Sequence, residues 1–370
     1  MANLYIIISA FVSAVILGRI IIPNILIISL RKRLFDVPDE RKVHKRPIPR
    51  LGGVTFFPVI LFSLCVFTAV RLMTGHGPAD TSTTDLVCEF LFLTGGLTLL
   101  YIVGIADDLI GVRYRKKFLV QIISAAMFPL SGLYINNFYG LFGIYLIPAE
   151  VGIPLTMLLV VFITNAINLI DGIDGLASGL SMVALLVFGV LFVHFRMWSY
   201  VMLAFVTVGV IIPFFSYNVF GSADLGRKIF MGDTGSLTLG YILSFFVIKY
   251  CMYEPDMLLT MKTSPVLVSF SVLMVPCLDV IRVVLRRARN KRSLFMPDKT
   301  HIHHKFLAMG FSPRRALVTI QLMSACFCAF TIVAILYMNN TLVFVIDVVV
   351  WTLLNLWFDH VINRKAKNGE

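Results

Sequence analysis

Long apolar runs separated by short polar segments are the feature that most constrains the fold of this chain. Of its 370 residues, 58% are hydrophobic and only 14% are charged, a composition typical of polytopic membrane proteins and not of soluble domains. A run of about 20 apolar residues is long enough for a helix to cross a bilayer. The sequence therefore predicts an all-α polytopic membrane protein, with residues 1–370 forming a single integral-membrane domain.

Eleven of these runs are predicted to be transmembrane helices. Residues 134–152 contain no basic residue, and their glycine and aromatic pattern predicts a short hairpin on the outer face. The predicted spans are Tyr5–Leu30, Gly52–Val70, Leu86–Ile105, Phe118–Leu133, Ile153–Ile170, Leu176–Val193, Tyr200–Phe215, Ser236–Val247, Pro265–Leu285, Leu317–Tyr337 and Leu342–Phe358.

The distribution of Lys and Arg predicts the orientation of these helices. With the N-terminus outside, the cytoplasmic segments hold 26 of the 32 basic residues, as expected from the excess of Lys and Arg in cytoplasmic loops. An odd number of spans then places the C-terminus in the cytoplasm. The net charge of +12 suits anionic lipids and phosphorylated substrates, whereas nucleic acid is a poor partner because the charge lies in short loops. The cytoplasmic segments are 31–50, 106–117, 171–175, 217–235, 286–316 and 359–370, and the first five are expected to form the active site.

A polar stretch, NAINLIDGIDGLASG, separates the fifth and sixth predicted spans from Asn165 to Gly179. Polar residues at the end of a membrane helix usually mark a site. Asn168, Asp171 and Asp174 recur every third residue, which on a helix keeps them roughly on one side. These hard oxygen donors suit Mg²⁺ or a network with sugar and base hydroxyls. The alternative is a polar helix cap beside a solvated turn.

Two adjacent carboxylates, Asp107 and Asp108, follow the third predicted span. They repel each other unless a cation lies nearby. Four basic residues within ten positions could supply that cation, so the segment offers a base or metal ligand beside phosphate-binding cations. An ordinary acidic and basic helix end is the alternative. The four residues are Arg113, Arg115, Lys116 and Lys117.

The segment Phe230–Ser236, FMGDTGS, is predicted to open the eighth span. A helix N-terminus favours anions, and Asp233 could hold a metal ion that bridges phosphates. The alternative is a simple N-cap formed by Thr234 or Ser236. That alternative accounts for the hydroxyl group but not for both glycines.

Two basic cytoplasmic loops carry histidine. Residues 31–50 include His44 and Arg50, and this loop is either a positive-inside anchor or a contributor to substrate binding. The other loop, 286–316, contains MPDKTHIHH, which ends in His304. The chain has no cysteine or second histidine pair at zinc-finger spacing, so cationic histidines that bind a diphosphate fit better than zinc.

Within the second loop, the orientation of each histidine is predicted from an extended backbone. Alternate residues of an extended segment share a face. His301 and His303 are therefore expected to point toward the substrate, while His304 faces away and supports the loop. On a helix, His301 and His304 would share a face instead.

Together these motifs resemble the polyprenyl-phosphate N-acetylhexosamine-1-phosphate transferase family. The resemblance covers essentially the whole chain and rests on four segments in the family's order: Asp107-Asp108, Asn165–Ala177, Phe230–Ser236 and Pro297–His304. The His-Ile-His-His form resembles the WecA/TagO branch, which uses UDP-GlcNAc, more than the MraY branch, which uses UDP-MurNAc-pentapeptide. An MraY-like phospho-MurNAc-pentapeptide transferase is the alternative within the family.

The resemblance implies transfer of N-acetylglucosamine 1-phosphate, or a related N-acetylhexosamine 1-phosphate, from the UDP-sugar to undecaprenyl phosphate. UMP is released, and the product initiates a cell-envelope polysaccharide. The implied cofactor is Mg²⁺, with Mn²⁺ as a substitute. The implied location is the bacterial cytoplasmic membrane, with the active site facing the cytoplasm. The expected partners are the UDP-N-acetylhexosamine, undecaprenyl phosphate, the lipid bilayer and a second copy of the chain in a homodimer.

The resemblance also assigns roles to matching residues. Asn168 and Asp233 would hold the metal, and Asp107 or Asp108 would assist the attacking lipid phosphate. The spacing leaves Lys116 and Lys117 as alternatives for a phosphate-binding lysine. Nucleotide-sugar binding is assigned to Asp171, Asp174, Lys116, His301 and His303, and support of the lipid phosphate or the loops to Arg50, His44 and His304.

A transporter is the alternative from a different functional class. Intramembrane charges such as Arg19 and Asp347 would then mark a transport pathway. The charged residues gather at one predicted membrane face, and no inverted repeat is visible. Both observations favour the transferase.

Overall fold

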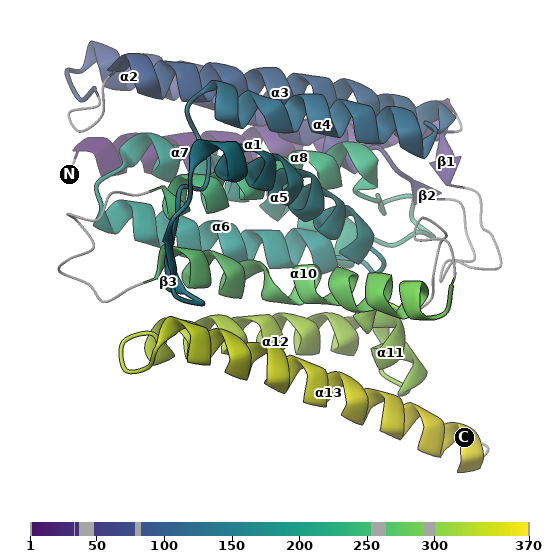
Figure 1. The fold of residues 1–370 in the computed structure, drawn as a ribbon. Helices are drawn as coiled ribbons and strands as arrows, with labels where there is room; N and C mark the ends of the chain where they lie inside the picture. Colours follow the sequence, from purple (N-terminus) through teal and green to yellow (C-terminus); the bar gives the residue numbers. More distant parts are fainter. Residues whose placement is uncertain are drawn as a thin grey trace. The chain divides into compact units, whose positions relative to one another are not determined.

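The computed structural model describes residues 2–32, 34–36, 48–77, 83–252, 264–291 and 300–368. This part of the chain is almost entirely helical (Figure 1). His44 and most of the loop 31–50 lie outside the described residues. The elements are α1 (Ala2–Arg31), β1 (Phe35–Asp36), β2 (Ile48–Pro49), the 3-10 helix η1 (Gly52–Thr55), α2 (Phe56–Met73), α3 (Thr83–Ile110), α4 (Tyr114–Leu130), β3 (Asn137–Leu141), β4 (Ile144–Leu146), α5 (Ala149–Ile170), α6 (Leu176–His194), α7 (Trp198–Val219), α8 (Gly232–Cys251), α10 (Pro265–Arg289), α11 (Ile302–Ala308), α12 (Pro313–Ala334) and α13 (Asn340–Asn368).

Within the described residues, ten helices are long and apolar enough to cross a membrane. This confirms the all-α polytopic class. The predicted count of eleven differs by one helix, α4, which coincides with the predicted span 118–133. That helix has 17 residues, and its first turn is basic, so its apolar part is shorter than the other spans.

The chain divides into two compact units, and α5, α6 and α8 contribute residues to both. Unit 1 consists of Met1–Leu133, Thr156–Asn168 and Ser181–Phe246. Unit 2 consists of Tyr134–Leu155, Leu169–Leu180 and Val247–Glu370.

In unit 1, α1 packs against α2 and α7, and α3 packs against α4 (Figure 1). The unit-1 part of α8 is deeply buried, although it carries several hydroxyl side chains. Small residues allow neighbouring helices to approach it closely. A Cβ on Gly240 would meet the backbone of Thr164, and one on Gly104 would meet Thr234. This packing fixes the N-terminal end of α8, which carries Asp233.

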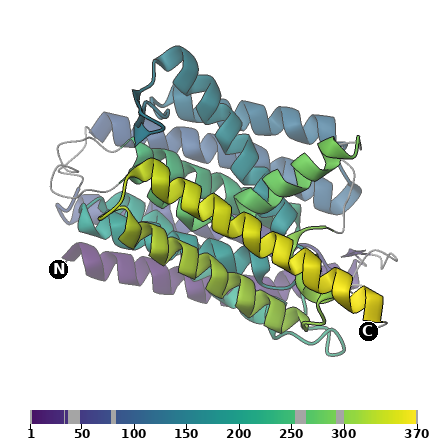
Figure 2. The same cartoon turned by 60° about the horizontal axis from the view of Figure 1, so that its bottom comes forward.

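In unit 2, α10 and α11 both contact α12 and α13. Figure 2 shows α12 and α13 side by side. The predicted hairpin within 134–152 is confirmed, since β3 pairs with β4 in an antiparallel arrangement. It is joined to α13 through the Phe142 N–H, which donates to Thr341 Oγ1 at 2.8 Å. Unit 2 also contains the described part of the histidine segment, at the start of α11.

Candidate active site

The N-terminus of α8 is capped by a carboxylate from another helix. Gly232 has φ +74°, a conformation that favours glycine, and α8 begins there. Asp108 of α3 accepts hydrogen bonds from the backbone N–H of Asp233 at 2.7 Å and of Thr234 at 3.0 Å. The Thr234 hydroxyl donates to the same carboxylate at 2.6 Å. The cap predicted from Thr234 or Ser236 is thus supplied mainly by Asp108.

The segment before α8 is held by the start of the second span. The Gly52 N–H donates to Phe230 O at 2.9 Å, and the Gly53 N–H donates to Met231 O at 2.8 Å. A Cβ on Gly232 would collide with the Arg50 carbonyl and with the Asp108 carboxylate. Arg50 therefore lies beside this junction through its backbone, while its side chain is exposed.

Asp107 faces a different set of groups from Asp108. The Lys117 ammonium donates to Asp107 Oδ2 at 3.2 Å and also pairs with Asp233 Oδ2. Asn168 Nδ2 donates to Asp233 Oδ1 at 2.9 Å and to Ser236 Oγ at 2.7 Å. Four side chains from α3, α4, α5 and α8 thus meet in unit 1. We call Asp107, Lys117, Asn168 and Asp233 the acidic cluster.

Lys117, and not Lys116, is the lysine of this cluster. Lys116 is exposed, and Lys117 is half-buried between two carboxylates. Burial by itself lowers the pKa of Lys117, but the charges of Asp233 and Asp107 outweigh it and raise the pKa above its usual value of 10.5. Lys117 is therefore a permanent cation in this cluster. The predicted loop 106–117 is shorter than expected, because Asp107 and Asp108 lie in the last turn of α3 and Lys117 in the first turn of α4.

The acidic cluster provides donors that fit a hard divalent ion. Asp107 and Asp233 converge on one cation, the Lys117 ammonium, and Asn168 adds an amide. The described residues include no group of three His, Cys, Asp or Glu side chains that could hold a metal. Mg²⁺ commonly uses one or two carboxylates and takes its remaining ligands from substrate phosphates and water. The donor set therefore fits Mg²⁺ in the presence of a phosphate substrate.

Asp171 and Asp174 do not continue the helix that carries Asn168. Helix α5 ends at Ile170, Asp171 is its C-cap residue, and residues 171–175 form turns. The prediction that the three oxygens share one side of a helix is therefore wrong for both aspartates, because the helix stops before them. Both side chains are half-buried, and both belong to unit 2.

The histidine segment is helical from Ile302, so the prediction of an extended loop is wrong for residues 302–304. His301 is the N-cap residue of α11. The His301 and His303 rings are nevertheless parallel, with an interplanar angle of 2° and centroids 6.0 Å apart. His304 does not simply face away, since its ring lies 4.2 Å from that of His303.

Asp279 of α10 anchors this segment. Its carboxylate lies 2.8 Å from His301 Nδ1, accepts the Ile302 N–H at 3.0 Å and pairs with Arg282 at 2.7 Å. Asp279 is completely buried. Asp279 was not among the residues predicted from the sequence, although the signal was present: a carboxylate inside a predicted span needs a partner and usually marks a site.

His303 has a mainly desolvated environment. Burial, together with neighbouring His304 and His301, lowers the pKa of His303 to about 3, although Asp279 acts in the opposite direction. His303 is therefore neutral at neutral pH, and the prediction of a cationic side chain does not hold for it. Its ring packs so closely on Gly172 that a Cβ there would overlap the imidazole. The absence of a side chain at Gly172 thus allows the His303 ring to lie against the backbone.

The two intramembrane charges that suggested a transporter have local partners. Arg19 lies over the Tyr217 ring, 5.4 Å from its centroid. Asp347 Oδ2 accepts a hydrogen bond from the Thr331 hydroxyl at 2.7 Å. These contacts explain both charges without a transport pathway.

Comparison with known proteins gives the family. Residues 90–251, which include all four members of the acidic cluster, match the model of glycosyl transferase family 4. A probable undecaprenyl-phosphate N-acetylglucosaminyl 1-phosphate transferase of Bacillus subtilis (strain 168) is 31% identical over 349 residues, 92% of this chain and 89% of the relative.

Two further relatives carry related names. The undecaprenyl-phosphate alpha-N-acetylglucosaminyl 1-phosphate transferase of Yersinia pestis is 29% identical over 302 residues, 80% of this chain and 76% of the relative. The decaprenyl-phosphate N-acetylglucosaminephosphotransferase of Mycolicibacterium smegmatis is 31% identical over 313 residues, 80% of this chain and 74% of the relative. With the matched segment and this coverage, the chain belongs to glycosyl transferase family 4, as its four motifs implied.

Proposed function

We propose that this protein transfers N-acetylglucosamine 1-phosphate from UDP-GlcNAc to undecaprenyl phosphate, as the first step of a cell-envelope polysaccharide. The names of the Bacillus subtilis and Yersinia pestis relatives describe transfer of this group to this lipid. The observation that carries the proposal is the acidic cluster, in which the Lys117 ammonium lies between Asp107 and Asp233 and Asn168 donates to Asp233. Such a cluster suits a reaction between two phosphate groups.

The proposed reaction is a phosphoryl transfer. An oxygen of the lipid phosphate attacks the phosphorus that carries the sugar, and a new P–O–P linkage forms. The P–O bond between that phosphorus and the bridging oxygen of UDP-GlcNAc breaks, and UMP leaves with the bridging oxygen. Because the attacking phosphate is already largely ionised near neutral pH, removal of its proton is a small part of the barrier. Neutralising and aligning the anions is the larger part.

Each residue of the acidic cluster is proposed to have a separate role in this reaction. Asp233 and Asn168 would hold Mg²⁺, which would neutralise charge on the diphosphate and on the leaving UMP. Asp107 would help to orient the attacking lipid phosphate. Lys117 keeps its charge, so it would contact a phosphate oxygen once substrate competes for the two carboxylates. Asp108 would act indirectly, by capping α8 and fixing Asp233.

We propose that further residues bind the nucleotide sugar, as the family resemblance implies. His301 is held by Asp279 through Nδ1, which leaves Nε2 for a substrate oxygen. Asp171 and Asp174 supply carboxylates for hydroxyl or base N–H groups. We place these residues at the cytoplasmic face of the bacterial inner membrane, because the basic residues are concentrated in the segments predicted to lie there.

A labelled-donor assay tests the proposal. Purified protein is mixed with radiolabelled UDP-GlcNAc, undecaprenyl phosphate and Mg²⁺ in detergent, and the lipid-linked product and UMP are quantified. Equal amounts of both products are expected, with loss on chelation and recovery on addition of Mg²⁺. Asp233→Asn should give no product while retaining the thermal midpoint of the unmodified protein.

Several donors make the result decisive. UDP-GalNAc and UDP-MurNAc-pentapeptide are assayed in parallel, and UDP-GlcNAc should give the highest kcat/KM. A higher value with UDP-MurNAc-pentapeptide would reassign the substrate. A folded protein that forms no lipid-linked product from any UDP-sugar would contradict the transferase function.

A further inference from the structure

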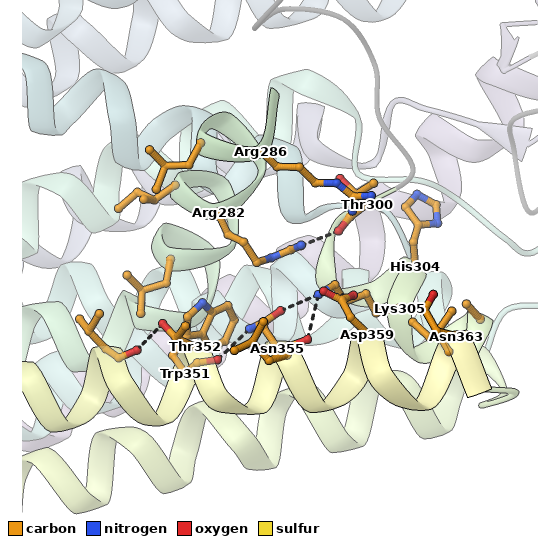
Figure 3. Close-up of a pocket in the computed structure, with 17 residues that line it drawn as sticks. Arg282, Arg286, Thr300, His304, Lys305, Trp351, Thr352, Asn355, Asp359 and Asn363 are labelled. Carbon is orange, nitrogen blue, oxygen red and sulfur yellow. Dashed lines mark hydrogen bonds and ion pairs between the residues drawn. The ribbon is translucent and has the colours of Figure 1, made fainter. Parts of the chain in front are cut away.

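We propose that unit 2 binds an anionic glycerophospholipid in a pocket between α10, α11 and α13. The pocket has a volume of about 700 Å³, and all three helices line it (Figure 3). Part of its lining is apolar and includes Leu278, Leu285 and Leu356. Leu285 is 63% exposed and Leu356 is 60% exposed. The pocket therefore opens onto an apolar surface that an acyl chain can cover.

Cations predominate among the charged residues of the pocket. Arg282 and Arg286 come from α10, and Lys305 comes from α11 (Figure 3). Among the described residues of the lining, Asp359 of α13 is the single carboxylate, and Lys305 Nζ donates to it at 2.8 Å. Three basic side chains against one acid leave an excess of positive charge. Basic pockets between membrane helices attract anionic lipid head groups.

Several buried polar groups of the lining have no hydrogen-bond partner within the described part of the chain. They are Arg282 Nε, Thr300 Oγ1 and Trp351 Nε1. Buried groups of this kind nearly always have a partner, in the protein, in water or in a ligand. All three can donate a hydrogen bond. Their position around one cavity points to an occupant rich in acceptor oxygens.

The charge distribution favours a phosphodiester over a phosphate monoester. Lys305 is held by Asp359 and by Asn355 Oδ1 at 3.1 Å, and Arg282 is held by Asp279 and by the Thr300 carbonyl. Arg286 is exposed. One exposed guanidinium and two neutral donors, Thr300 Oγ1 and Trp351 Nε1, match a single negative charge, whereas a monoester carries nearly two at neutral pH.

This chemistry distinguishes the occupant from the acceptor lipid. Undecaprenyl phosphate is a monoester, and none of the residues that line the pocket belongs to the acidic cluster. A phospholipid here would touch α10, α11 and α13 at once and so hold α11 in place. The proposal concerns lipid binding and does not rest on the proposed transferase function.

Binding is tested on the full-length protein by native mass spectrometry. Phosphatidylglycerol and phosphatidylcholine with identical acyl chains are titrated separately. Arg286→Gln removes the exposed charge of the pocket, and Arg289→Gln is the matched control, since it is exposed on the same helix but does not line the pocket. Trp351→Phe removes the indole N–H and keeps an aromatic ring.

The unmodified protein should retain phosphatidylglycerol in preference to phosphatidylcholine. Arg286→Gln should weaken phosphatidylglycerol binding by roughly fivefold, the equivalent of about 1 kcal/mol for one basic residue at an anionic membrane surface. Trp351→Phe should also weaken it, and Arg289→Gln should not. Equal retention of both lipids, or equal effects of the two arginine variants, would overturn the proposal. Displacement of phosphatidylglycerol by equimolar undecaprenyl phosphate would assign the pocket to the acceptor and would also overturn it.

Discussion

Asp107 and Asp108 are adjacent in sequence but differ in what they contact. Asp108 accepts hydrogen bonds from the N-terminus of α8, whereas Asp107 faces Lys117. An unequal pair could be expected from the sequence, because adjacent carboxylates rarely have the same role. The role of each aspartate could not be predicted, because it depends on where α8 begins. The sequence likewise could not decide between Lys116 and Lys117, because the residue at which α4 begins determines which of the two side chains faces the cluster.

The first prediction contrasts the two aspartates. Asp108→Asn should lower the thermal midpoint, because a helix cap contributes about 1 kcal/mol and the new amide would face two N–H groups. Its activity should fall as Asp233 becomes misplaced. Asp107→Asn should keep the midpoint and lose turnover. Thermal melts and initial rates in the same detergent measure both effects. Equal, mild losses in the two variants would show that the pair is only a solvated helix end.

The second prediction uses the neighbouring lysines as a matched pair. Lys117→Gln leaves Asp107 and Asp233 facing each other without their cation. Turnover should fall by about 10- to 100-fold, as for the loss of a charge-assisted hydrogen bond. Lys116→Gln makes the same charge change at an exposed position and should keep the unmodified rate. A larger loss in the Lys116 variant would reverse the assignment.

Among the helices, α11 is one whose formation cannot be predicted from its own residues. A helix of seven residues is too short to be stable alone. It forms because Asp279 accepts its first N–H and because Lys305 is bonded to Asn355 and Asp359 of α13. These partners are distant in sequence, so the histidine pattern alone favoured an extended loop.

The third prediction is a coupling between Asp279 and His301. Asp279→Asn should raise the KM for the UDP-sugar by about tenfold, because His301 loses the bond that fixes its ring. His301→Gln should have a similar effect, and the double variant should be little worse than either single one. Steady-state kinetics of the four proteins give the coupling. Asp279→Asn combined with His360→Gln, an exposed histidine of α13, should show simple additivity.

The fourth prediction follows from the lowered pKa of His303. The unfolded chain takes up a proton near pH 6.5, while folded His303 does so only near pH 3. Stability contributed by neutral His303 is therefore complete above pH 6.5 and is lost as the pH falls below it. The loss reaches at most about 1.4 kcal/mol per pH unit. The surrounding titratable groups are His301, His304 and Asp279.

Thermal midpoints between pH 7.5 and 5 measure this effect. His303→Gln should flatten the decline on acidification, whereas His360→Gln should leave it unchanged. If the decline has the same slope in all three proteins, His303 is not its source.

For the whole molecule, hydrophobic runs were sufficient to predict the membrane class and ten of the eleven expected spans, and the glycine and aromatic pattern predicted the hairpin. A run of about 20 apolar residues forms few stable structures other than a transmembrane helix, so this prediction depends little on the rest of the chain. The C-terminal end of α4 was predicted too late in the chain, because the residues after Leu130 belong to the segment that leads to β3. The acidic cluster needed tertiary contacts, which no single run of sequence contains.

The fifth prediction concerns topology. Reporter fusions at the two termini should place the N-terminus outside and the C-terminus in the cytoplasm, following the distribution of Lys and Arg. This outcome requires an odd number of crossings, so α4 must cross the membrane in addition to the ten longer helices. A fluorescent protein that folds only in the cytoplasm should be bright at the C-terminus, and alkaline phosphatase should be active at the N-terminus. The opposite pattern at both ends would invert the proposed face of the active site.

The bond between Asp108 and the N-terminus of α8 also has a consequence for biogenesis. The two partners are separated by 125 residues. At a synthesis rate of about 5–20 residues per second, roughly 6–25 s pass between the synthesis of Asp108 and the synthesis of Asp233, whose N–H it binds. Until then the Asp107-Asp108 end of α3 has no Asp233 or Thr234 to bind. A ribosome that stalls late in this interval leaves a nascent chain in which Lys117 can already pair with Asp107, while Asp108 still lacks the backbone N–H groups that it caps.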